Sequence, residues 1–129
     1  MINHVMVGTN DLGRAKAFYD AVLGVLGVGE PTRNVDDTGH VRLFYGHDGV
    51  VFGVTLPIDG EPANPGNGGT IAFKCNSSSQ VSAFRDTALD NGGTSIESAQ
   101  VSVGSLGSIK AYVRDPDGNK LCAIHYPAN

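Results

Sequence analysis

The sequence predicts an α+β fold made of two copies of one strand–helix–three-strand (βαβββ) module. Three observations carry this prediction: an internal repeat, one helix-period segment in each half, and period-two strands around a turn at the end of each half. Glycine, with 18 of 129 residues, is about twice as frequent as average, which is typical of chains with many tight turns.

The repeat aligns residues 4–27 with residues 70–93 at a constant offset of 66. Later in each half the offset becomes 69, so that Gly46–Gly49 matches Asp115–Gly118. Six identities support the first alignment: Asn10/Asn76, Ala17/Ala83, Phe18/Phe84, Asp20/Asp86, Leu23/Leu89 and Gly27/Gly93.

Each half opens with a short apolar strand followed by a capped amphipathic helix. The predicted strands are Val5–Val7 and Ile71–Phe73. Asn10 and Asp11 can cap the first helix, and Ser77 with Gln80 three residues later forms a capping-box pattern for the second. Apolar residues then recur every three or four positions, which predicts helices over 11–26 and 78–91.

After each helix the pattern changes to strands. The strands placed by this pattern are His40–Tyr45, Val50–Leu56, Lys110–Arg114 and Lys120–Tyr126. In the Asp115–Gly118 turn, Pro presets its own φ and Gly accepts a positive φ. Because one helix covers one face of a sheet, the opposite, concave faces of the two modules are expected to curl around a shared cavity.

Length and composition bound the class of protein. We expect a single domain over 1–129, with module one at 1–57, a linker at 58–68 and module two at 69–129. The net charge of −4 without any basic run argues against a nucleic-acid partner, and no apolar stretch is long enough for a membrane. Two cysteines and no signal peptide favour reduced thiols and a cytoplasmic location.

Three segments carry a resemblance to a known family: Ile2-Asn3-His4-Val5, Gly68–Phe73 and Val113–Leu121. With the repeat, they make the chain resemble the vicinal oxygen chelate superfamily of glyoxalases, bleomycin resistance proteins and dioxygenases. The resemblance implies a glyoxalase-like pair of half-barrels and a divalent metal held by up to four strand residues. The repeat places those positions at His4, Gly53, Thr70 and Cys122.

These four residues are a poor set of metal ligands. Glycine offers no donor, threonine is a weak neutral donor, and cysteine prefers soft ions, so only His4 matches the type expected from the family. We therefore expect no metal cofactor, although a divalent ion completed by other groups is an alternative. A glyoxalase-type isomerisation also needs a base, and no Asp or Glu occupies any of the four positions.

The resemblance leaves three functions open. The first is binding of a small molecule in the concave cavity without a metal, as in the drug-resistance branch of the family. The second is a lyase or isomerase of the lactoylglutathione lyase type, assisted by a metal or by the candidate catalytic residues His4 and Cys122. The third is a structural or regulatory protein with a vestigial cavity.

The candidate ligand-binding residues are His4, Arg42, Thr70, Tyr112, Arg114 and Cys122. Strand alternation directs residues 110, 112 and 114 to the cavity and their neighbours to the helix. Arg42 is assigned to the same surface, but under the offset of 69 it pairs with 111, so either a bulge intervenes or one assignment is wrong. His40 and His47 are expected in solvent, and Arg114 has the alternative of an ordinary surface charge.

Unpaired strand edges predict a homodimer with pockets at or near its interface. The linker permits modules to pair within one chain or between two chains.

Overall fold

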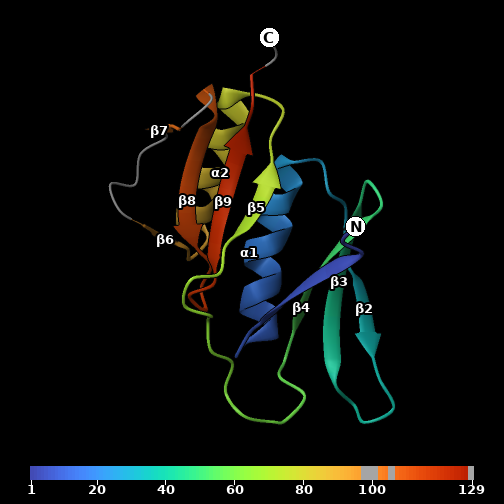
Figure 1. The fold of residues 1–129 in the computed structure, drawn as a ribbon. Helices are drawn as coiled ribbons and strands as arrows, with labels where there is room; N and C mark the ends of the chain where they lie inside the picture. The colour runs from blue at the N-terminus through green and yellow to red at the C-terminus, as the bar shows by residue number, and fades with distance from the viewer. Residues whose placement is uncertain (97–101, 105–106, 128–129) are drawn as a thin grey trace.

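The structure is a computed structural model that describes residues 1–96, 102–104 and 107–127. The first half contains β1 (His4–Gly8), α1 (Leu12–Val25), β2 (Thr32–Val35), β3 (Val41–His47) and β4 (Val50–Thr55). The second half contains β5 (Ile71–Lys74), α2 (Ser78–Asp90), β6 (Thr94–Ser95), β7 (Ser102–Val103), β8 (Ile109–Arg114) and β9 (Lys120–His125) (Figure 1). The predicted α+β fold of two βαβββ modules is confirmed, with the short β7 as an addition in the second.

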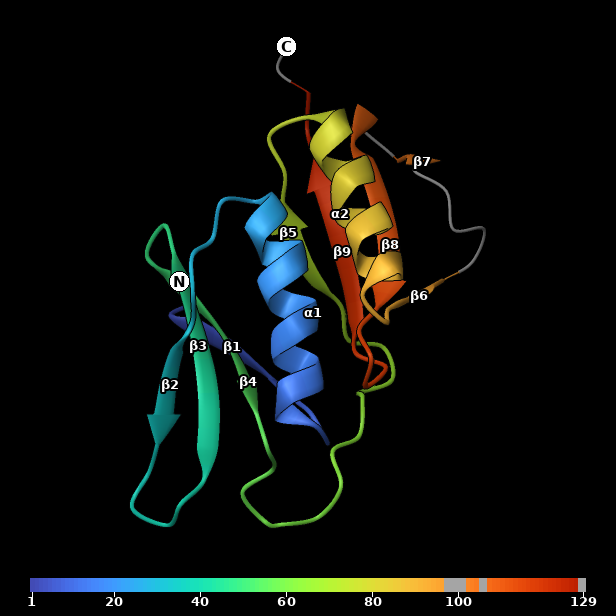
Figure 2. The ribbon, with the colours of Figure 1, turned by 180° about the vertical axis from the view of Figure 1, so that it is seen from behind.

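Both modules have the same sheet topology. The first sheet has the strand order β1-β4-β3-β2, and the second has the order β5-β9-β8-β6 with β7 also paired to β8. In each sheet the opening strand runs parallel to the last strand, and the remaining pairs are antiparallel. Both helices lie on the same side of the two sheets (Figure 2), so one face of each sheet is covered and the other is left open.

The helix caps follow the sequence pattern. The Asp11 carboxylate accepts a hydrogen bond from the backbone N–H of Arg14 at 3.0 Å, and the Ser77 hydroxyl accepts one from the N–H of Gln80 at 3.1 Å. The Gln80 side chain also donates to the carbonyl of Val25 at 2.9 Å, which ties the start of α2 to the end of α1. None of the helices in the described part of the chain is long and apolar enough to cross a membrane.

A single hydrophobic core joins the modules. A series of aromatic contacts runs through it, with ring centroids 4.8 Å apart between Tyr19 and Phe52 and 5.3 Å apart between Phe52 and Phe73. The series continues from Phe73 to Phe84 at 5.7 Å. Since Tyr19 and Phe52 belong to the first module and Phe73 and Phe84 to the second, each half completes the core of the other.

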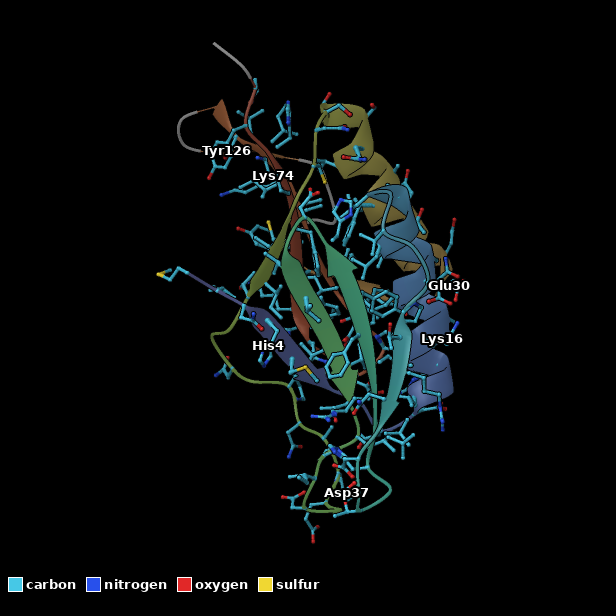
Figure 3. All side chains as sticks on the ribbon, turned by 90° about the vertical axis from the view of Figure 1, so that its right-hand side faces the viewer. His4, Lys16, Glu30, Asp37, Lys74 and Tyr126 are labelled. Atoms are coloured by element: carbon cyan, nitrogen blue, oxygen red, sulfur yellow. The ribbon has the colours of Figure 1, made fainter. Side chains whose placement is uncertain are left out.

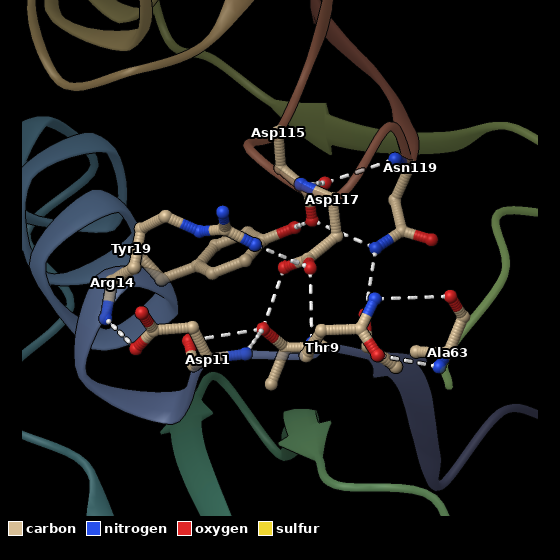
Figure 4. A network of polar contacts seen from close by, with 10 residues as sticks. Thr9, Asp11, Arg14, Tyr19, Ala63, Asp115, Asp117 and Asn119 are labelled. Carbon is tan, nitrogen blue, oxygen red and sulfur yellow. Dashed lines mark hydrogen bonds and ion pairs between the residues drawn. The ribbon is translucent and has the colours of Figure 1, made fainter. Parts of the chain in front are cut away.

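A network of polar contacts joins the same two halves (Figure 4). The turn between β8 and β9 docks on the start of α1. The Asp117 carboxylate, only 3% exposed, accepts hydrogen bonds from the Thr9 hydroxyl at 2.5 Å and the Asn10 N–H at 3.0 Å. The Arg14 guanidinium contacts the same carboxylate at 2.7 Å. The Asp-Pro-Asp-Gly segment therefore connects the modules as well as forming a turn.

The neighbouring Asp115 is held from both modules. It accepts a hydrogen bond from the Tyr19 hydroxyl at 2.5 Å and another from the Asn119 amide at 2.8 Å. The Asn119 amide also donates to the carbonyl of Gly8 at 3.0 Å. Burial, together with the charge of Asp115, raises the pKa of Tyr19 well above its ordinary value, so this tyrosine remains a hydrogen-bond donor.

Candidate functional site

The uncovered sides of the two sheets form a surface that we call the open face. Figure 3 shows the helices on one side of the molecule and the His4 and Lys74 side chains on the other. The strand register assigns the remaining members, since residues paired across strands point to the same side. The open face includes His4, Met6, Arg42, Phe44, Ala72, Lys74, Lys110, Tyr112, Arg114, Lys120 and Cys122, together with Thr32, Asn34, Val51, Gly53, Thr55 and Ile124.

The register resolves the uncertain assignment of Arg42. Arg42 pairs with Thr55 on β4, and Lys110 pairs with Ile124 on β9. The hairpin β3–β4 of the first half corresponds to β8–β9 of the second. Equivalent residues are 68 positions apart in the first strand (42 and 110) and 69 apart in the second strand (55 and 124). One extra residue in the second turn accounts for the difference. Arg42 therefore faces the cavity as predicted, and Lys110 is its counterpart.

The first sheet carries a cavity of about 480 Å³ on the open face. His4 and Arg42 both line it, so two of the predicted ligand-binding residues come together here. The Nδ1 atom of His4 lies 2.8 Å from the Asn3 side-chain oxygen, and Nε2 has no hydrogen-bond partner among the described residues. In the tautomer in which Nδ1 donates to the Asn3 oxygen, Nε2 is an acceptor on a side chain that lines the cavity. The complete lining is Asn3, His4, Met6, Thr32, Arg42, Phe44 and Val51.

Arg42 is held in place by neutral groups. Its Nη2 and Nε atoms donate to the Asn34 side-chain oxygen at 2.6 and 3.2 Å. Its guanidinium carbon lies 5.3 Å from the centroid of the Phe44 ring. No carboxylate within the described residues pairs with it. Arg42 thus offers a positioned positive charge beside an aromatic ring.

The four positions at which the family resemblance predicts metal ligands, His4, Gly53, Thr70 and Cys122, carry residues that do not fit a metal. A Cβ added at Gly53 would lie 2.1 Å from the Met6 sulfur and 3.2 Å from a Phe44 ring carbon, so Met6 fills the space of a ligand side chain. Thr70 lines a separate cavity of about 320 Å³ between the modules. Within the described ranges, no three His, Cys, Asp or Glu side chains are grouped to hold an ion.

Cys122, the second candidate catalytic residue, is buried in the second sheet. Its sulfur donates weakly to the carbonyl of Ala123 at 3.7 Å. Burial raises the pKa of the Cys122 thiol above its ordinary value, although nearby Lys110 and Lys120 act in the opposite direction. A thiol with a raised pKa is a poor nucleophile at neutral pH. Among the described residues, no hydrogen bond connects Cys122 to His4.

The other second-sheet candidates lie in different surroundings. Tyr112 is half-buried, with the Lys120 and Lys110 ammonium groups 4.9 and 5.9 Å from its ring centroid. Arg114 donates to the carbonyl of Gly118 at 2.7 Å and lines a small cavity beside the linker. The two lysines were not among the predicted binding residues, although the alternation of the strand already placed Lys110 beside Tyr112.

One histidine prediction is wrong. His40 was expected in solvent, but its side chain is only 12% exposed. The ring contacts the carbonyl of Leu56, and its Nε2 lies 2.9 Å from the Thr55 hydroxyl. The antiparallel pairing of β3 with β4 places His40, the residue before β3, beside Thr55 and Leu56 at the end of β4, and these contacts bury the ring. His47 is exposed as predicted, at the β3–β4 turn.

The comparisons with known proteins agree with this architecture. A model of the Glyoxalase/Bleomycin resistance protein/Dioxygenase superfamily matches residues 1–123. The structure of a glyoxalase/bleomycin resistance protein from Albidiferax ferrireducens T118 is 46% identical, with a TM-score of 0.90 over 98% of this chain and 99% of that chain. No curated protein matches the chain.

Two structures with lower sequence identity are similar to this chain in fold. A lactoylglutathione lyase from Agrobacterium tumefaciens is 19% identical, with a TM-score of 0.66 over 97% of this chain and 92% of that chain. The fosfomycin resistance protein FosX from Listeria monocytogenes, in complex with Mn(II), is 16% identical, with a TM-score of 0.68 over 98% and 93%. Because the family model matches residues 1–123 and the protein from Albidiferax ferrireducens is 46% identical over 98% of this chain, the chain belongs to the glyoxalase/bleomycin resistance protein/dioxygenase superfamily.

Proposed function

We propose that this protein binds a small organic molecule on its open face without the help of a metal ion. The observation that carries the proposal is the first-sheet cavity, which keeps a positioned histidine and arginine while Met6 fills the space over Gly53. A cavity of about 480 Å³ falls within the range of small-molecule sites. Binding and sequestration need only such a cavity, whereas the chemistry of metal-dependent relatives needs ligands that these positions do not supply.

A lyase or isomerase activity is the second candidate. The supporting observation is that His4 lines the cavity and that its Nε2 has no hydrogen-bond partner among the described residues, so a neutral His4 with Nε2 as the acceptor could remove a proton from a bound molecule. Cys122 contributes less to this candidate because of its raised pKa. Turnover of the hemithioacetal formed from methylglyoxal and glutathione, abolished by His4→Ala, would favour this second candidate over binding alone.

We also infer a two-fold dimer with the cavities at or near its interface. The edge strands β1 and β5 each have one unpaired side among the described strands, and Ile2 beside β1 is exposed. The open face of one chain offers a broad surface on which a second copy can close the cavities. Light scattering at micromolar concentration should give twice the 13.4 kDa of one chain, and a stable monomer would refute the dimer.

The binding proposal is tested by nuclear magnetic resonance with a mixture of small organic fragments and chelator-treated protein. We expect fragments that shift the resonances of open-face residues, with binding lost in Arg42→Ala. Arg33→Ala is the matched control, because Arg33 lies on the adjacent strand and is exposed at the other face. Fragment binding that needs an added metal ion, or that leaves the resonances of the open-face residues unshifted, would refute the proposal.

A further inference from the structure

The charges of the chain are segregated in a way that the proposed function does not itself require. Five of the nine Lys and Arg residues belong to the open face, although the chain has a net charge of −4. Twelve of the 13 acidic residues lie in the described ranges, and none of these twelve is on a strand. The open-face cations are Arg42, Lys74, Lys110, Arg114 and Lys120.

Among the described residues, these five cations lack the carboxylate partners that the basic residues on the two helices have. The three basic residues on the helices, Arg14, Lys16 and Arg85, each contact a carboxylate at 2.7 Å or less. Within the described part of the chain, no open-face cation lies within 4.0 Å of a carboxylate. An unpaired group of like charges is costly in the free protein and becomes favourable when an anion binds.

Two of the cations share one aromatic ring. The Lys120 and Lys110 ammonium groups lie 4.9 and 5.9 Å from the Tyr112 centroid, within the range of cation–π contact. Tyr112 pairs with Cys122 across the sheet, and its ring is half-buried on the open face. A flat ring can stack beside Tyr112 while an attached anionic group lies between the two ammonium groups.

We infer that the cluster of Lys110, Tyr112 and Lys120 binds a planar organic anion, such as an aromatic carboxylate. The inference rests on the proposed function, since it names the chemical class of the bound molecule. It adds a second contact region on β8 and β9 to the one around Arg42 on β3. The lysines supply the charge recognition, and Tyr112 supplies the surface for the ring.

The test uses two probes of nearly equal shape, 2-naphthoate and its neutral amide 2-naphthamide, with the full-length protein in isothermal titration calorimetry. We expect 2-naphthoate to bind at least about ten-fold more tightly than 2-naphthamide, and the difference to shrink as salt rises. Lys110→Gln and Lys120→Gln should each weaken 2-naphthoate binding by about five-fold and leave 2-naphthamide unchanged. Tyr112→Leu should weaken both probes.

Lys16→Gln is the control, because it makes the same change in net charge on α1, away from the open face. It should change 2-naphthoate affinity by less than about two-fold. Equal affinity for the two probes, or equal weakening of 2-naphthoate binding by Lys16→Gln and Lys120→Gln, would overturn the anion site. Neither result would contradict the proposed binding of a small molecule on the open face. Failure of both probes would also overturn the anion site, while the fragment experiment decides the proposed function separately.

Discussion

Replacing Asp117 with alanine should remove the main polar contact between the two modules and destabilise the fold. The Asp117 carboxylate is 3% exposed and receives hydrogen bonds from the Thr9 hydroxyl, the Asn10 N–H and the Arg14 guanidinium. All three donors belong to the first module, whereas Asp117 belongs to the second. The substitution therefore tests whether the Asp-Pro-Asp-Gly turn stabilises the assembled fold.

The size of the effect follows from the three contacts. A hydrogen bond to a charged group contributes about 1.5–3 kcal/mol when it is buried. The contact with Arg14 contributes less than about 1 kcal/mol, because the Arg14 side chain is 46% exposed and water screens its charge. The Thr9 hydroxyl retains a second acceptor, the carbonyl of Asp11 at 3.0 Å, which limits the penalty there. We expect Asp117→Ala to lower the free energy of unfolding by about 2–4 kcal/mol.

Urea denaturation followed by circular dichroism measures this difference. Asp86→Ala is the control, because the Asp86 side chain is 64% exposed and its one partner among the described residues is the neighbouring Arg85. The control should change the free energy of unfolding by less than about 0.5 kcal/mol. A loss below about 1 kcal/mol for Asp117→Ala would refute the role of this turn as a contact between modules.

Three further substitutions or probes test other parts of the structure. Gly53→Ala should push the Met6 side chain toward the cavity and lower the free energy of unfolding by about 1–3 kcal/mol; an unchanged Met6 methyl resonance would contradict this. Hydrogen bonds, first from the Thr38 hydroxyl, lower the pKa of Asp36 to about 2, so its contribution to stability is present above about pH 4 and lost as the pH falls toward 2. Asp36→Asn should flatten that part of the pH profile, and a carboxyl titration by nuclear magnetic resonance at the ordinary pKa would contradict it. Because burial raises the pKa of Cys122, alkylation of this thiol in the folded protein at neutral pH should be far slower than in urea, and equal rates would count against its burial.

Local signals in the sequence located most of the elements. The helices expected over 11–26 and 78–91 are Leu12–Val25 and Ser78–Asp90, because apolar periodicity and capping side chains act over a few residues. The two short strands β2 and β6 were expected as part of each module but were not placed. They lie at sheet edges and consist largely of exposed residues, so no alternating apolar pattern marks them.

The candidate site could be predicted only in part. Alternation correctly assigned Tyr112 to the open face, and the repeat located Gly53 on the central strand of the first sheet. The filling of the space over Gly53 by Met6, and the approach of Lys120 to Tyr112, depend on contacts between strands distant in the sequence. Such contacts follow from the register of the folded sheet, which no local pattern encodes.

Metal content is the most direct test of the central claim, that this member of the superfamily uses its cavity without the family's metal. The protein should be purified without chelators and analysed by plasma mass spectrometry for zinc, nickel, manganese and iron. The arrangement of His4, Gly53, Thr70 and Cys122 predicts far less than one equivalent of any of these metals per chain, and the same content in His4→Ala. One equivalent of a single metal, lost in His4→Ala, would contradict the claim.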